Sequence, residues 1–62
     1  MQKIEHIGIA VRDIEESNKL FAKLLNTEHY KMEAVESEGV ITSFFQVGDV
    51  KIELLQATKE TS

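Results

Sequence analysis

Residues 3–11 have the sequence KIEHIGIAV, and this stretch decides the fold. Its β-branched residues and its alternation of two sets of side chains predict a strand. Ile7, Ile9 and Val11 fall on one face, which we expect to be the core face because a helix can cover it. His6 then points to the opposite face. The stretch therefore predicts a sheet with one face buried beneath a helix and His6 on the other face.

A helix is predicted directly after this strand, over residues 14–25. Asp13 followed three residues later by Glu16 is a capping-box-like start, in which the Asp13 carboxylate accepts a backbone N–H. Asn26 stands where a left-handed residue commonly ends a helix. Apolar or small residues recur at three- and four-residue steps and predict one stripe along the helix. This stripe comprises Ile14, Ser17, Leu20, Phe21, Leu24 and Leu25.

Three further strands are predicted after the helix. They cover residues 29–36, 40–47 and 50–57. Glu38-Gly39 is a turn signal between the first two of them, and Gly48-Asp49 is a two-residue hairpin signal between the last two. The predicted order of elements is therefore β-α-β-β-β, an α+β fold in a single module over residues 1–57. The polar tail at residues 58–62 is expected to begin a linker.

The composition limits the stability and the partners of the chain. A domain of 62 residues without cysteine has no disulfide to stabilise it. It buries only about 60% of the surface of its unfolded chain, so we expect a second module or a second copy as partner. The net charge of −4 and the scattered Lys and Arg residues argue against nucleic acid. No stretch is typical of a signal peptide or a membrane span, so a cytoplasmic protein is expected.

His6 and Glu53 are the residues best suited to carry chemistry. Both are predicted in mid-strand on the face opposite the helix, and the first and last strands of such a module can pair in parallel. Histidine nitrogen and carboxylate oxygen suit a divalent Zn, Co, Mn, Ni or Fe ion. Two ligands are fewer than a metal centre usually needs. On the residues alone, a half-exposed histidine and a solvated glutamate are the simpler interpretation.

Other polar and aromatic residues are weaker candidates. Thr42, Phe44 and Gln46 share the face on which His6 is predicted, where they are expected to line a substrate cavity; ordinary sheet surface is the alternative. Phe44 on that face is a large apolar group in need of cover, which indicates a bound partner or ligand. His29 is interpreted as a surface residue at the start of a strand. The sequence contains no glycine-rich phosphate loop, nucleophile elbow or cysteine nucleophile.

Three segments resemble the methylmalonyl-CoA epimerases of the vicinal oxygen chelate (glyoxalase/bleomycin resistance) superfamily. They are HIGIAVRDIEES, LFAKLLN and ESEGVITSFFQVGDVKIELLQAT, and the resemblance runs over residues 4–58. Members of this family carry two βαβββ modules in tandem, which form a half-open barrel around a divalent metal. The resemblance implies that this chain is the N-terminal module, half of such a barrel, followed by the start of the inter-module linker.

The resemblance also implies roles for individual residues. His6 matches the metal ligand of the first strand, and Glu53 matches a glutamate or glutamine ligand of the fourth. Thr42 falls where some epimerases carry a glutamate proposed as a second base, and threonine cannot do that work. The family's further ligands and its catalytic glutamate belong to the second module. No catalytic residue is therefore assigned within this chain.

For the complete enzyme, the resemblance implies a 1,1-proton transfer at the carbon α to a thioester, with the acyl-CoA ester methylmalonyl-CoA as substrate. A divalent cation would stabilise the charge that develops as the proton leaves. We expect the chain to be inactive unless a second module, or a second copy in a two-fold homodimer, completes the site. The alternatives are a lactoylglutathione lyase-like or other vicinal-oxygen-chelate activity, and a non-catalytic module that binds small ligands.

Overall fold

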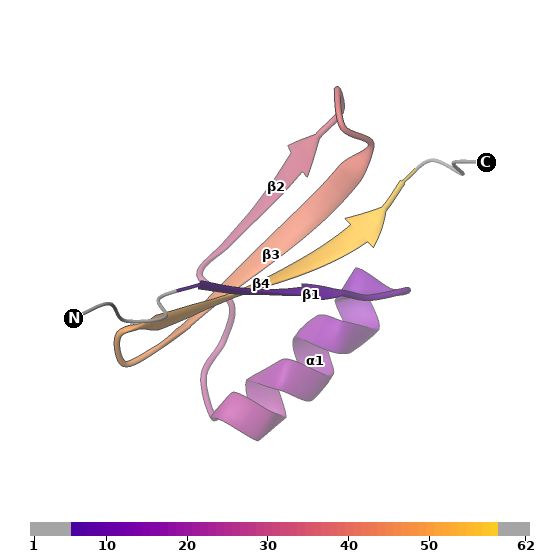
Figure 1. The fold of residues 1–62 in the computed structure, drawn as a ribbon. Helices are drawn as coiled ribbons and strands as arrows, with labels where there is room; N and C mark the ends of the chain where they lie inside the picture. The colour runs from indigo at the N-terminus through magenta and orange to yellow at the C-terminus, as the bar shows by residue number, and fades with distance from the viewer. Residues whose placement is uncertain (1–5, 59–62) are drawn as a thin grey trace.

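The computed structural model describes residues 6–58 and shows a four-stranded mixed sheet with one helix on one of its faces (Figure 1). The elements are β1 (His6–Ala10), α1 (Ile14–Leu25), β2 (Lys31–Val35), β3 (Val40–Val47) and β4 (Val50–Ala57). This arrangement confirms the predicted single βαβββ module. Residues 3–5 of the predicted first strand and residues 59–62 of the predicted linker lie outside the described residues.

The strands of the sheet follow the order β1-β4-β3-β2. β1 and β4 pair in parallel, whereas β4 with β3 and β3 with β2 pair in antiparallel fashion. Gly48 lies in the two-residue hairpin between β3 and β4 and has φ 60°, a conformation that residues with a side chain rarely adopt. The first and last strands of the module are therefore direct neighbours, as predicted.

The two ends of α1 have the predicted caps. The Asp13 carboxylate accepts the backbone N–H groups of Glu15 and Glu16, each at 3.1 Å. Asn26 ends the helix in the left-handed conformation, with φ 57° and ψ 40°. A further contact ties the helix to the sheet, because the N–H of Ile14 donates to the side-chain oxygen of Gln56 in β4 at 2.7 Å. The start of α1 is thus fixed over β4, the strand that carries Glu53.

The core lies between α1 and the sheet. Its buried apolar members are Ile14, Phe45 and Leu54, and Ile9 and Val11 pack against them as expected. A polar contact bridges the same interface: the Ser43 hydroxyl of β3 donates to Asn18 Oδ1 of α1 at 2.5 Å, with both side chains buried. Within residues 6–58 no helix is long and apolar enough to cross a membrane.

The predicted helix stripe is wrong at two positions. Leu20 and Leu24 are 54% and 67% exposed, whereas Asn18 is only 8% exposed and faces the sheet. Ile14 and Leu25 lie along one line on the side of the helix that faces the sheet. Because successive helix residues turn by about 100°, both leucines lie about a quarter turn or more from that line. One sheet covers only the side of the helix centred on that line. The two leucines are therefore apolar groups that this module alone leaves uncovered.

Candidate metal centre

His6 and Glu53 meet on the sheet face opposite α1, which we call the open face. His6 Nε2 lies 2.7 Å from Glu53 Oε1. The parallel register of β1 and β4 explains the contact: Gly8 lies directly opposite Glu53, and His6 lies two residues before it on the same side. The side chains are 53% and 20% exposed respectively, so the pair is accessible from solvent.

The two side chains fit one divalent cation. Imidazole nitrogen and carboxylate oxygen are both good ligands for such ions, and they lie close enough to bind one ion once the proton between them is lost. Across residues 6–58, no three His, Cys, Asp or Glu side chains are gathered in one place. Zinc centres usually have four ligands. The pair therefore supplies half of a site, and ligation by these two residues stays a prediction.

The three predicted cavity residues lie on the open face beside this pair. In the register of β3 and β4, Phe44 is opposite Glu53, and Thr42 and Gln46 flank it. Thr42 is only 3% exposed and its hydroxyl donates to the backbone oxygen of Glu33 at 3.3 Å. Gln46 donates to the backbone oxygen of the hairpin residue Gly48 at 3.1 Å. Gln46 is exposed and Phe44 is half-buried, and a role of all three in substrate binding stays a prediction.

Two lysines on the open face were not singled out from the sequence. Lys51 is the register partner of His6, and Lys31 is the register partner of Phe44. The Lys31 ammonium lies 4.9 Å from the centroid of the Phe44 ring. The alternation of side chains along a strand predicts that Lys51 shares a face with Glu53, because the two residues are two positions apart. The contact of Lys31 with Phe44 depends on the pairing of β2 with β3, which alternation alone does not reveal.

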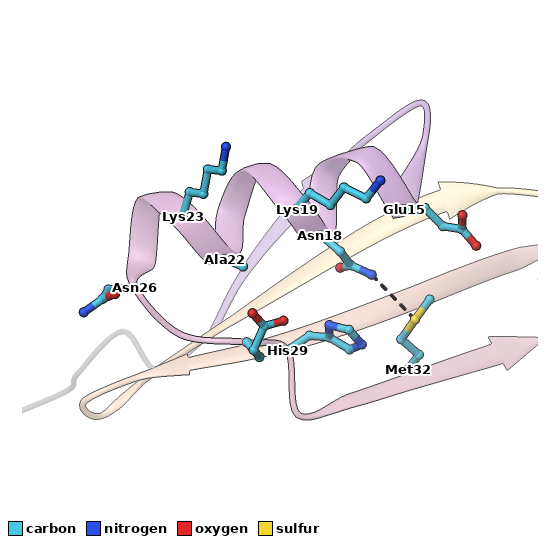
Figure 2. Close-up of a pocket in the computed structure, with 9 residues that line it drawn as sticks. Glu15, Asn18, Lys19, Ala22, Lys23, Asn26, His29 and Met32 are labelled. Atoms are coloured by element: carbon cyan, nitrogen blue, oxygen red, sulfur yellow. Dashed lines mark hydrogen bonds between the residues drawn. The ribbon is translucent and has the colours of Figure 1, made fainter.

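A hollow of about 720 Å³ lies on the other side of the sheet, between α1 and β2 (Figure 2). Asn18 and Met32 face each other across it, with Asn18 Nδ2 3.6 Å from the Met32 sulfur. Its lining includes two lysines and two glutamates, so its charge favours neither anions nor cations. The lining residues are Glu15, Asn18, Lys19, Ala22, Lys23, Asn26, Glu28, His29 and Met32.

The prediction that His29 is a surface residue was wrong. Its ring packs edge-on against Phe45, with centroids 6.0 Å apart, and its Nδ1 atom is buried without a hydrogen-bond partner among the described residues. The predicted strand over residues 29–36 is shorter in the structure and begins at Lys31. His29 instead belongs to the connection that carries the chain from α1 to β2, where its ring turns toward the core.

Comparisons with known proteins agree with this fold. Residues 5–62 match the family model of the Glyoxalase/Bleomycin resistance protein/Dioxygenase superfamily. The uncharacterized protein YqjC of Bacillus subtilis (strain 168) is 38% identical over 56 residues, which are 90% of this chain and 40% of that protein. A crystal structure of a hypothetical protein from Bacillus halodurans C-125 is also 38% identical, with TM-score 0.86 over 97% of this chain and 44% of that one.

A methylmalonyl-CoA epimerase is similar in structure as well. A variant of the Streptomyces coelicolor enzyme, in complex with 2-nitronate-propionyl-CoA, is 26% identical with TM-score 0.86 over 100% of this chain and 47% of that chain. The chain thus spans less than half the length of the proteins it matches. The family match over residues 5–62 and the βαβββ fold together show that the chain belongs to the glyoxalase/bleomycin resistance protein/dioxygenase superfamily, the vicinal oxygen chelates.

Proposed function

We propose that this chain is one half of a metal-dependent isomerase that moves a proton at the carbon α to a thioester, as a methylmalonyl-CoA epimerase does. The observation that carries the proposal is the 2.7 Å contact of His6 with Glu53 on the open face. Similarity to a methylmalonyl-CoA epimerase in complex with methylmalonyl-CoA and NH4+, at 26% identity and TM-score 0.86, supports the choice of reaction.

His6 Nε2 and Glu53 Oε1 would hold the divalent cation, whether Co, Zn, Mn, Ni or Fe. When bound, such a cation stabilises negative charge on the substrate oxygens as the α proton leaves. His6 and Glu53 are then engaged as ligands, so neither of them is the base. The Thr42 hydroxyl, which already donates to Glu33, is no base either. We therefore place the proton-transferring carboxylate on the unit that completes the site.

We infer that this completing unit is a second βαβββ module or a second copy of the chain. β1 carries His6 and lies at the edge of the sheet, with β4 as its only neighbour among the described strands. An uncovered strand edge and uncovered apolar side chains both favour association. Ile7 on β1 is 43% exposed, and Leu20 and Leu24 on α1 are more exposed still. A two-fold related copy would add a second His6 and a second Glu53. Three of these four side chains would hold the cation, and the carboxylate of the second Glu53 would be left to move the proton.

The reaction is tested by deuterium exchange at the α carbon of methylmalonyl-CoA in D2O, followed by NMR with the cobalt-loaded chain. Light scattering on the same sample identifies the associated form. We expect exchange above the rate with free cobalt in the associated form and none in the monomer. His6→Ala and Glu53→Ala should abolish the exchange. Glu28→Gln, which changes an exposed carboxylate in the α1–β2 connection, should leave the exchange unchanged.

A different result would replace the epimerase proposal. A cobalt-loaded dimer that exchanges the α proton no faster than free cobalt contradicts it. The superfamily match also includes glyoxalases, so formation of S-lactoylglutathione from methylglyoxal and glutathione in the same samples would assign a lactoylglutathione lyase-like reaction instead. Binding of either thioester without turnover would assign a non-catalytic ligand-binding module.

A further inference from the structure

We propose that Lys31 forms an anion-binding subsite on the open face, which receives a negatively charged group on the thiol side of a thioester ligand. The inference rests on the proposed function, because the acyl end of that ligand is oriented by His6 and Glu53. It adds a specificity-determining residue on β2, the strand farthest from β1 in the sheet.

One row of paired residues crosses the open face from the metal pair to Lys31. Gly8 of β1 is opposite Glu53 of β4, Glu53 is opposite Phe44 of β3, and Phe44 is opposite Lys31 of β2. Neighbouring strands are about 4.8 Å apart, so the backbones of Lys31 and Glu53 are separated by about 10 Å. A ligand that lies across the sheet along this row meets the metal pair, then an aromatic ring, then an ammonium group.

The Lys31 ammonium is held in this row by an aromatic ring and not by an acid. Its Nζ lies 4.9 Å from the centroid of Phe44, a cation–π distance. The ring of Tyr30 lies 6.1 Å from the same ring and is itself exposed. The chain has eleven acidic and seven basic residues, yet within residues 6–58 no carboxylate forms an ion pair with Lys31. The charge of Lys31 is therefore available to a ligand.

The order of groups along the row defines the class of ligand. The acyl oxygens belong at His6 and Glu53, an apolar or amide-containing spacer belongs over Phe44, and an anion belongs at Lys31. The carboxylates of a glutathione thioester lie at a distance that this row spans directly, whereas the phosphates of a coenzyme A thioester lie at the end of a longer arm, which reaches Lys31 when it folds over Phe44. Thioesters of pantetheine have a similar spacer without any charge. The shared chemistry is thus an anionic group on the thiol portion, and binding experiments separate its two sources.

The test measures dissociation constants of the cobalt-loaded chain for propionyl-CoA, S-lactoylglutathione and propionyl-pantetheine by calorimetry. Lys31→Met keeps an unbranched side chain over Phe44 and removes the charge. We expect it to weaken binding of the anionic thioester by about fivefold, the scale of an exposed ion pair, and to leave the pantetheine ester unchanged. Lys31→Arg should restore the affinity. Lys23→Met, on the outer side of α1 (Figure 2), should change neither.

The outcomes separate this inference from the proposed function. Preference of the wild-type chain for propionyl-CoA over S-lactoylglutathione, or the reverse, identifies which anionic thioester the subsite serves. If Lys31→Met loses the same affinity for charged and neutral esters, or loses affinity for neither, the anion subsite is overturned. The proposed role of His6 and Glu53 in metal binding is not affected by that result. Failure of the cobalt-loaded wild-type chain to bind any of the three thioesters overturns the proposed function and this inference with it.

Discussion

The buried contact between Ser43 and Asn18 fixes α1 on the sheet, and its removal should lower the free energy of unfolding. Ser43 is 0% exposed and its hydroxyl donates to Asn18 Oδ1 at 2.5 Å. Ser43→Ala leaves that amide oxygen buried without its donor, because Asn18 is itself 8% exposed. Such a loss costs about 1–3 kcal/mol. A chain of this size has a total stability of about 3–9 kcal/mol, so the change is large.

Replacing both partners should cost far less than replacing one. Asn18→Leu combined with Ser43→Ala substitutes an apolar contact for the polar one, and no buried group is left unsatisfied. Such paired replacement is nearly neutral. Urea unfolding followed by circular dichroism measures the effect. With an m-value of about 1 kcal/mol/M, a loss of about 2 kcal/mol lowers the midpoint of Ser43→Ala by about 2 M.

The single variants Ser43→Ala and Asn18→Leu and the double variant form a double-mutant cycle, which needs a control that leaves this contact intact. Ser37→Ala, an exposed serine between β2 and β3, should leave the urea midpoint unchanged. If Ser43→Ala is as stable as the wild type, the contact does not hold α1 on the sheet. If the double variant is less stable than either single variant, the two side chains act independently and the reasoning is refuted.

Three further changes test the core, the hairpin and the exposed leucines. Leu54→Ala removes a side chain that is 0% exposed and should lower the free energy of unfolding by about 2–5 kcal/mol. Circular dichroism should then show that much of the chain is unfolded, whereas a folded variant of wild-type stability contradicts the described core. In Gly48→Ala the added methyl group meets no atom within 4 Å, but the residue must keep φ at 60°. This backbone strain should lower the free energy of unfolding in urea by about 1 kcal/mol, and Gly48→Asn should lower it less. Equal stability of the wild type and both variants argues against that turn. Leu20→Ser with Leu24→Ser removes side chains that are 54% and 67% exposed, and should weaken self-association in light scattering while the monomer keeps its circular dichroism spectrum; unchanged association excludes these leucines from the interface.

The fold and the metal pair follow from local patterns that the sequence displays directly. Alternation in the first and last strands places His6 and Glu53 on one face, and the parallel pairing of β1 with β4 brings them to 2.7 Å. Asp13 and Asn26 mark the ends of α1 because each residue acts on the backbone beside it. These features depend on neighbours within a few residues or on one strand pairing.

The features that were missed depend on contacts between distant segments. The helical period groups Leu20 and Leu24 with Leu25, but the position of a single sheet decides which of them is covered. His29 turns inward because Phe45, on β3, offers its ring as a partner. Neither contact leaves a trace in the spacing of residues along the chain.

Cobalt titration of the chain, with the visible absorption bands as readout and light scattering in parallel, tests whether His6 and Glu53 hold a divalent metal. We expect two copies to associate with one cobalt bound per pair, and the bands to be lost in both His6→Ala and Glu53→Ala. His29→Ala, the matched histidine control away from the open face, should keep them, provided that its circular dichroism shows an intact fold. A folded wild-type chain that binds no cobalt at micromolar concentration, or that binds it equally well without His6, would contradict a metal centre at this pair.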